Sequence, residues 1–396
     1  MIDRRNLLAG IGMAGLAGSP ADGRPAQNVG RRRDPKPADD LEKRAAEGRG
    51  ANRIDVHHHL IPPAWSASAE RHGLKKVAGA PLPDWTPEKS LSVMNINGIQ
   101  TAILSLSAPG VLFGDRAEAR DVARASNDYA AELKVRRQGR FGSFAVLPMP
   151  FTDDAVREAI YALDTLHAEG VVLLGSTDGK FLGDPQFDEL MAELDRRKAI
   201  VFVHPNIHPT SEQLGLQIPG FFVEFLCDTT RAATNMMFNG TLKKYRNIRF
   251  ILAHAGGFLP YIAWRLSLAN DMPEWAAKVP GGVLDAIRGF YFDTALSPAP
   301  WVLAALNELV DPSHILFGSD FPFAPAPAVG MERKSLEGLK NVSRPEKLAI
   351  NRGNALELFP HFARFAGDPA NASVGNKIKG AVTKPVVDLG DAIRKR

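Results

Sequence analysis

The chain has little cysteine and no long apolar run, and these absences exclude several classes of protein. Cys227 is the only cysteine in 396 residues, so the chain can form neither an internal disulfide nor a cysteine-ligated metal cluster. No internal stretch is long and apolar enough to span a bilayer, so stable membrane insertion is not expected. The net charge is only +4, and basic residues gather near the chain ends, at 31–33 and 377–396. Such runs are usually solvated, and nucleic-acid binding is therefore not expected.

Eight short apolar runs of strand length follow one another along the chain. They cover residues 53–58, 101–106, 141–147, 170–174, 199–204, 249–254, 289–294 and 314–319. Stretches with helical character lie between them, at 117–137, 153–168, 184–198 and 301–309 among others. Eight strands alternating with helices predict a parallel sheet closed into a (β/α)8 TIM barrel. An open doubly wound sheet is the alternative.

Two histidines in the first predicted strand, His57 and His59, are the strongest functional signal. Side chains two residues apart on a strand point to the same face, so these two imidazoles lie together while His58 faces the other way. Paired imidazoles are typical metal ligands. Alone, the pair has a structural explanation as well.

Three further strand ends carry a residue that can bind a metal, namely His204, His254 and Asp320. In TIM barrels the reactive groups lie at the carboxyl ends of the strands. One polar residue at the end of a buried strand can be structural. Four such ends with His-x-His, His, His and Asp together predict a metal site.

These motifs resemble the amidohydrolase-related family that includes aminocarboxymuconate-semialdehyde decarboxylase and 6-methylsalicylate decarboxylase, a branch of the metal-dependent amidohydrolase superfamily. The resemblance covers residues 53–362, nearly the whole globular part. Besides the five strand-end residues it rests on 104–110, 127–129, 140–142, 182–185 and 228–232. These motifs are specific for the family but not for one substrate.

The resemblance implies a mononuclear site in which His57, His59, His204 and Asp320 bind one divalent metal. It also implies that His254 is the catalytic residue and acts on a metal-bound water, whose pKa the metal lowers to ~7. His254 could instead only orient a ligand.

The ligand types suit Zn²⁺, with Mn²⁺ as the alternative. The fourth predicted strand, 170–174, carries only apolar residues beyond its glycine and offers no bridging lysine. We therefore expect one metal per chain.

The sequence departs from the semialdehyde decarboxylase pattern at one position. That pattern has a carboxylate-gripping arginine shortly after Trp-x-Pro-Glu, whereas here Trp85 begins such a segment and Lys89 and Ser90 follow it. The change argues against a dicarboxylate substrate. Lys89 could substitute as a point charge, or it is simply solvated. Residues 60–85 are expected to form a small lid insertion after the first strand, with Trp85 lining the site.

Arg231 is a competing anchor for a substrate anion, or it forms a helix-start ion pair with Asp228. Phe222 and Phe225, just before it, are expected to pack in the core rather than to stack on a substrate.

Three functions are considered. The leading one is a metal-dependent carboxy-lyase (decarboxylase) that acts on a small aromatic or unsaturated carboxylate and uses a metal-activated water. The alternative is a metal-dependent hydrolase of a lactone, amide or ester at the same mononuclear site. The third is a non-catalytic metal-binding relative. The partner is a small-molecule carboxylate or ester, and a homodimer is the oligomer considered.

The chain termini look unlike the barrel. Arg4 and Arg5, followed by a weakly apolar stretch at 7–17, are typical of a twin-arginine export signal. A periplasmic or secreted protein is therefore expected, and the alternative is a cytoplasmic enzyme with a basic N-terminus. The expected organisation is a signal at 1–30, a flexible linker at 31–50, the barrel domain at 51–365 and a polar tail at 366–396.

Overall fold

The computed structural model describes residues 52–365, so the expected signal, linker and C-terminal tail lie outside the described residues. One sheet of eight parallel strands forms the centre. In sheet order these are β1 (Arg53–His59), β4 (Ile99–Ser105), β5 (Phe141–Val146), β6 (Gly170–Leu174), β9 (Ile200–His204), β10 (Arg249–Leu252), β11 (Tyr291–Asp293) and β12 (Ile315–Leu316). All eight predicted strands are present.

Backbone hydrogen bonds between β1 and the segment after β12 close the sheet. Val56 N donates to the Phe317 carbonyl at 3.0 Å, and Asp320 N donates to the His57 carbonyl at 2.8 Å. The first and last strands therefore lie side by side, as closure of a barrel requires. The predicted TIM barrel is confirmed, and the open-sheet alternative is wrong.

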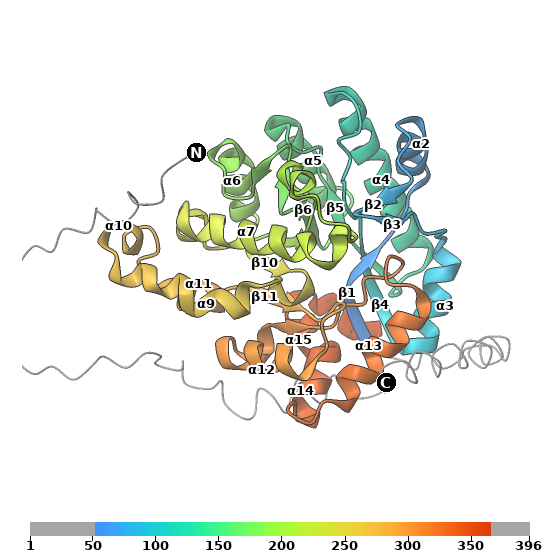
Figure 1. Cartoon of the computed structure of the whole chain (residues 1–396). Coiled ribbons are helices and arrows are strands. Elements are labelled where there is room, and N and C mark those ends of the chain that lie inside the picture. Colours follow the sequence, from blue (N-terminus) through green and yellow to red (C-terminus); the bar gives the residue numbers. More distant parts are fainter. Residues whose placement is uncertain (1–51, 366–396) are drawn as a thin grey trace, which may run out of the picture. The chain divides into compact units, whose positions relative to one another are not determined.

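Helices surround the strands (Figure 1). The longer ones are α2 (Pro63–Arg71), α3 (Pro87–Asn97), α4 (Arg116–Arg136), α5 (Thr152–Asp164), α6 (Asp188–Arg196), α7 (Glu224–Phe238), α9 (Leu259–Ser267), α12 (Pro300–Leu309) and α13 (Ala326–Gly338). The shorter ones are α8 (Thr241–Lys244), α10 (Pro273–Ala276), α11 (Val283–Arg288), α14 (Arg344–Leu348) and α15 (Asn354–Leu358). None of the helices in this described range combines the length and apolar content needed to cross a bilayer.

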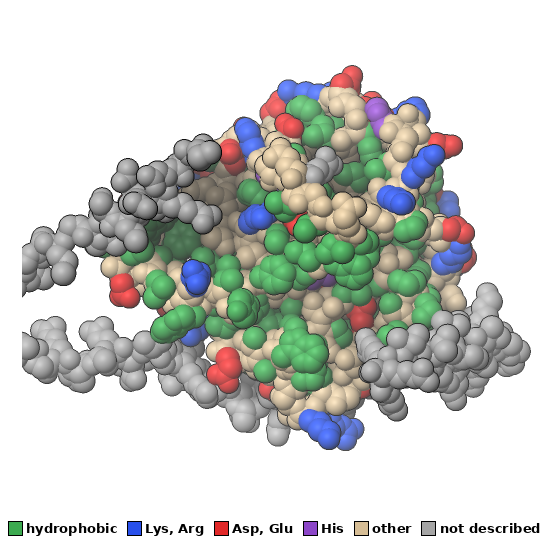
Figure 2. All heavy atoms as spheres, in the orientation of Figure 1, with side chains coloured by type: hydrophobic (Ala, Val, Ile, Leu, Met, Phe, Trp, Pro, Cys, Tyr) green, Lys and Arg blue, Asp and Glu red, His purple; other side chains and the backbone are tan. Residues whose placement is uncertain are grey.

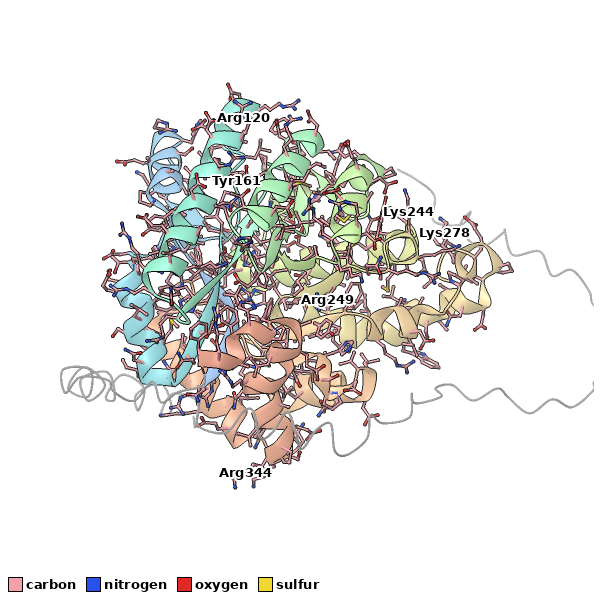
Figure 3. The ribbon with its side chains drawn as sticks, turned by 180° about the vertical axis from the view of Figure 1, so that it is seen from behind. Arg120, Tyr161, Lys244, Arg249, Lys278 and Arg344 are labelled. Carbon is pink, nitrogen blue, oxygen red and sulfur yellow. The ribbon has the colours of Figure 1, made fainter. Side chains whose placement is uncertain are left out.

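The helix sequences explain their position. In α4 the buried residues recur every three or four positions, at Ala119, Val122, Ala123, Ser126, Asn127, Ala130 and Leu133, so one face packs on the barrel. Helices α3, α12 and α14 begin with a proline in their first turn, where the missing N–H costs no hydrogen bond. Charged side chains such as Arg120, Lys244 and Arg344 lie at the periphery (Figure 3).

Two strands end two or more residues earlier than the sequence predicts. Strand β10 ends at Leu252, two residues before His254, and β12 ends at Leu316, four residues before Asp320. Both His254 (φ 54°) and Asp320 (φ 55°) adopt the left-handed backbone conformation, which no strand can contain. The reactive residues thus lie on turns just beyond the strand ends.

The predicted insertion after the first strand is present. It contains α2 and a small antiparallel hairpin formed by β2 (Lys76–Val77) and β3 (Ala80–Pro81). The hairpin contacts the loop after β9, because Phe221 N donates to the Ala78 carbonyl at 3.2 Å. These two segments together cover part of the barrel mouth.

Gly318 lies where β12 passes closest to β1 and β11. A Cβ atom at this position would lie 2.9 Å from His57 Cβ and 3.2 Å from Asp293 Cβ. Only a residue without a side chain fits there unless the neighbours move. The barrel closure thus depends on this glycine.

Replacing Gly318 by alanine should lower the free energy of unfolding by about 1–3 kcal/mol, since the added methyl overpacks the closed barrel. Urea denaturation measures this. Gly338→Ala is the matched control, because a Cβ there has no neighbouring heavy atom within 4 Å. That variant should be neutral or about 0.4–1 kcal/mol more stable. Equal destabilisation by both changes would contradict the packing argument.

Candidate metal centre

The structure brings the four predicted metal ligands together at the carboxyl ends of the strands. One ligand atom from each of His57, His59, His204 and Asp320 lies within 4.8 Å of the others, and all four residues are buried. His58 is outside this group, because its ring nitrogens lie 2.9 Å from Asp55 Oδ2 and from Ser90 Oγ. Three imidazoles from β1 and β9 and one carboxylate from the turn after β12 thus converge on one small volume.

Hydrogen bonds set the orientation of the three imidazoles. Each Nδ1 lies beside an oxygen that can only accept: Asp293 Oδ2 at 2.8 Å from His57, the Ser105 carbonyl at 3.1 Å from His59, and the Pro205 carbonyl at 2.8 Å from His204. The Nδ1 atoms therefore carry the ring protons and donate. Each Nε2 then presents a lone pair to the centre, the arrangement found in metal-binding histidines.

These lone pairs face one another at short range. His57 Nε2 and His59 Nε2 lie 3.1 Å apart, and Asp320 Oδ1 lies 2.9 Å from His59 Nε2. Acceptors at these distances repel unless a positive charge lies between them. The donor set therefore fits a divalent cation, and imidazole with carboxylate oxygen suits zinc or manganese.

The pKa values also indicate that the centre requires positive charge. Burial disfavours a protonated His57, but the carboxylates of Asp293 and Asp320 outweigh burial and raise the pKa of His57 to about 10. Burial likewise opposes ionisation of Asp320, yet the adjacent His57 and His59 hold its pKa well below the usual range. A divalent cation supplies the charge that the proton on His57 otherwise supplies.

Asp293, at the end of β11, is a residue that the sequence analysis did not single out. Besides accepting from His57, its carboxylate accepts hydrogen bonds from the backbone N–H groups of His254 at 2.9 Å and Ala295 at 3.0 Å. It thus orients a predicted ligand and the predicted catalytic residue together. In the sequence, Asp293 stands near the end of an apolar strand, and this position could have marked it as a candidate site residue.

His254 lies beside the four ligands but outside their group. Its Nδ1 donates to the Ala295 carbonyl at 3.2 Å, so the neutral ring carries its lone pair on Nε2. Burial, and then the positive charge of His57, lower the pKa of His254. The imidazole is therefore unprotonated at neutral pH and can accept a proton.

A cavity of about 420 Å³ opens directly onto this centre. His204, His254 and Asp320 form part of its wall, and the rest is mostly apolar: Val77, Ala80, Phe221, Phe222, Phe225, Leu226, Leu296, Phe323, Ala324 and Pro325, with Ser107 and Ser297. No lysine or arginine among residues 52–365 lines it. In Figure 2, histidine surface appears among hydrophobic side chains near the centre of the visible face.

Phe225 packs in a buried apolar cluster with Val77 and Ala108, as expected, and both Phe222 and Phe225 also line the cavity. Phe222 is 58% exposed, whereas Phe225 is buried. Phe222 lies between β9 and α7, and Phe225 lies in the first turn of α7. Short-range sequence patterns do not show that both side chains reach the cavity.

The three predicted substrate contacts do not line this cavity. Trp85 is buried and donates its Nε1–H to Ser90 Oγ at 2.8 Å. Lys89 Nζ lies at the surface, 2.5 Å from the Asp84 carboxylate. Arg231 is exposed on α7. Their role in substrate binding stays a prediction. Their positions outside the cavity wall do not support it.

Alanine at both His57 and His59 should abolish metal binding, since two of the four ligands are lost, and the wild type should hold one ion per chain. His58→Ala should keep that ion. It should still lower the free energy of unfolding by about 1–3 kcal/mol, because the ring bonds Asp55 Oδ2 and Ser90 Oγ, both at 2.9 Å.

Elemental analysis of the purified variants and thermal unfolding measure these effects. Two tightly held ions in the wild type, or complete metal loss in His58→Ala, would show that the assigned ligand set is wrong.

Comparisons with known proteins show which family this chain resembles. The amidohydrolase family model matches residues 54–361. The 6-methylsalicylic acid decarboxylase of Penicillium expansum is 38% identical over 314 residues, covering 78% of this chain and 96% of that protein. A crystal structure of an amidohydrolase II is 34% identical with a TM-score of 0.73, covering 78% of this chain and 100% of the other.

A dihydroxybenzoic acid decarboxylase from Polaromonas sp. JS666, crystallised with manganese and the inhibitor 2-nitroresorcinol, shares the fold. Its TM-score is 0.67 at 23% identity, and the match covers 78% of this chain and 97% of that one. The resemblance predicted from the sequence is confirmed. The chain belongs to the amidohydrolase family, as one of its enzymes.

Proposed function

We propose that the protein is a metal-dependent decarboxylase of a small aromatic carboxylate. The observation that carries this proposal is the cavity wall, which has four phenylalanine rings and no basic side chain among the described residues. An aromatic ring fits such a wall, whereas a carboxylate on that ring finds positive charge only at the four-ligand centre. The similarity to 6-methylsalicylic acid decarboxylase supports the same class of substrate.

We propose that His57, His59, His204 and Asp320 hold one divalent cation, either Zn²⁺ or Mn²⁺. When bound, this cation supplies the positive charge that receives the substrate carboxylate and acts as a Lewis acid. Mixed imidazole and carboxylate donors suit zinc, and the manganese in the Polaromonas enzyme supports the second choice.

Decarboxylation requires one proton. The bond between the ring carbon and the carboxylate carbon breaks, carbon dioxide leaves, and the electron pair stays on the ring carbon. That carbon then takes up a proton to give the arene. His254 is the group in the cavity wall that can move this proton, because its unprotonated Nε2 can take up a proton from the buffered solvent and pass it to the ring carbon, which returns the imidazole to its neutral form.

Incubation of the metal-loaded protein with 6-methylsalicylate and other substituted benzoates should release carbon dioxide and the corresponding arene in equal amounts. Gas release with product chromatography measures both. A panel of lactones, amides and esters serves as the comparison. Release of a new acid from that panel without carbon dioxide from any benzoate would establish the hydrolase and overturn this proposal.

His254→Asn should lower kcat by about 10²–10⁴-fold while keeping the metal, because an amide cannot accept a proton near neutral pH. In the wild type the lowered pKa of His254 keeps the ring neutral at pH 7. Activity should therefore fall only as the pH drops below the ordinary histidine range of about 6.5. Near-normal turnover of His254→Asn with metal bound would exclude the proton-transfer role.

A further inference from the structure

Glu332 is a buried residue of α13 that belongs neither to the ligand group nor to the cavity wall. Only 8% of it is exposed, and its Oε1 has no hydrogen-bond partner within residues 52–365. Its Oε2 accepts a hydrogen bond from Leu296 N at 3.0 Å. An apolar side chain of similar length would avoid the cost of burying a half-satisfied carboxyl group. The bond to Leu296 is therefore what a glutamate contributes at this position.

This hydrogen bond does not require a negative charge on Glu332. Burial raises the pKa of Glu332 well above its usual range, and the negative charges of Asp320 and Asp55 act in the same direction. Burial outweighs the hydrogen bond from Leu296 N, which opposes it. A neutral carboxyl group still accepts through its carbonyl oxygen, and the amide of a glutamine offers the same acceptor.

The Leu296 N–H belongs to the peptide group that also bonds His254. The carbonyl of this peptide group is that of Ala295, and it accepts the hydrogen bond from His254 Nδ1 at 3.2 Å. A peptide group is planar, and its C=O and N–H point in opposite directions. The carboxyl group of Glu332 and the imidazole of His254 therefore bond the two ends of one rigid unit.

The backbone at this peptide group needs support from its neighbours. Leu296 adopts a left-handed conformation (φ 53°), which a residue with a Cβ avoids unless surrounding contacts hold it there. Its own side chain is 52% exposed and offers little packing. Helix α13 supplies two contacts, from Glu332 to Leu296 and from the Ser335 hydroxyl to the Pro298 carbonyl at 2.6 Å. The helix thus holds the segment after β11.

The ring of His254 depends on this segment more than its backbone does. Asp293 Oδ1 accepts from His254 N at 2.9 Å and therefore fixes the backbone. The ring makes one hydrogen bond within the described part of the chain, to the Ala295 carbonyl. A displaced Ala295 carbonyl would leave the ring without a partner that sets its tautomer and its orientation.

We propose that Glu332 is a positioning residue for His254 and acts through the peptide group between Ala295 and Leu296. By holding the Leu296 N–H, it keeps the Ala295 carbonyl where that carbonyl accepts the Nδ1 proton of His254. The lone pair of His254 Nε2 then stays available for proton transfer. Hydrogen bonds at the two ends of one peptide group also polarise and strengthen each other. The inference rests on the proposed function and deepens it.

The first experiment separates the hydrogen-bond acceptor at position 332 from its packing. We measure kcat and KM for carbon dioxide release from 6-methylsalicylate in the wild type, Glu332→Gln and Glu332→Met. Methionine keeps the length but lacks the acceptor, so kcat should fall about ten- to hundred-fold with KM nearly unchanged. Glutamine keeps the acceptor and should retain most of the activity. If Glu332→Met does not fold, Glu332→Ala replaces it, since alanine also lacks the acceptor and cannot overpack.

An unchanged kcat in Glu332→Met, or an equal loss of kcat in Glu332→Gln, would overturn the inference. A double variant tests whether the effect passes through His254. Glu332→Met introduced into His254→Asn should change kcat by less than about two-fold, because the group that it positions is already absent. A loss equal to the product of the two separate losses would show that Glu332 acts independently of His254, and would also overturn the inference.

Glu158→Met is the matched control, because it makes the same change at another buried glutamate. Glu158 lies on α5 and bonds two residues of α4, Asn127 Nδ2 at 2.8 Å and Arg124 Nε at 2.9 Å. Its loss should lower the midpoint of thermal unfolding without lowering kcat. Metal content should be equal in all variants. A fall in kcat as large as that in Glu332→Met would show that lost stability, and not position, explains the effect.

Nuclear magnetic resonance separates this inference from the proposed function, because it needs no turnover. In zinc-loaded protein with isotope-labelled histidine, the Nδ1–H signal of His254 is identified by its absence from His254→Asn. It should persist in Glu332→Gln and broaden or vanish in Glu332→Met. If the wild type releases no carbon dioxide from any benzoate, the proposed function fails and this comparison alone decides the role of Glu332. An unchanged signal in Glu332→Met would exclude that role.

Discussion

The hydrogen bond from Asp320 N to the His57 carbonyl joins the last strand of the barrel to the first. It completes the cylinder, and it also places the Asp320 carboxylate beside two imidazoles that β1 already presents on one face. The reactive centre therefore forms at the seam of the barrel and exists only when the barrel is closed. Gly318 permits the close approach on which this seam depends.

Charge balance around that seam explains why the centre is buried. Asp293 and Asp320 place two buried carboxylates against three buried imidazoles, and an isolated negative charge there would be costly. A bound cation would offset this cost, and no lysine or arginine among the described residues lines the cavity. In the proposed function, holding the metal and receiving the substrate carboxylate would depend on the same positive charge.

The barrel and the five candidate residues at the strand ends could be predicted because strand periodicity and strand ends are local properties of a sequence. The division into four ligands and His254 came from the resemblance to the family. Asp293 could not be assigned a role in this way, since its contacts are with His57 and His254 on other strands or the turns after them. The side-chain directions of Lys89 and Arg231 depend on helix packing, so a local motif suggested contacts that the fold does not make. Phe222 and Phe225 line the cavity from the segment that precedes α7 and from its first turn, a placement that depends on the tertiary fold.

His254 and Asp320 both adopt a left-handed backbone that most residues with a Cβ avoid. The surrounding hydrogen bonds keep these two residues in this conformation at a cost in conformational energy. A glycine at either position would remove the chemistry and relieve that cost. Stability and activity therefore oppose each other at these two positions. A substitution that stabilises the backbone there would also remove a reactive side chain.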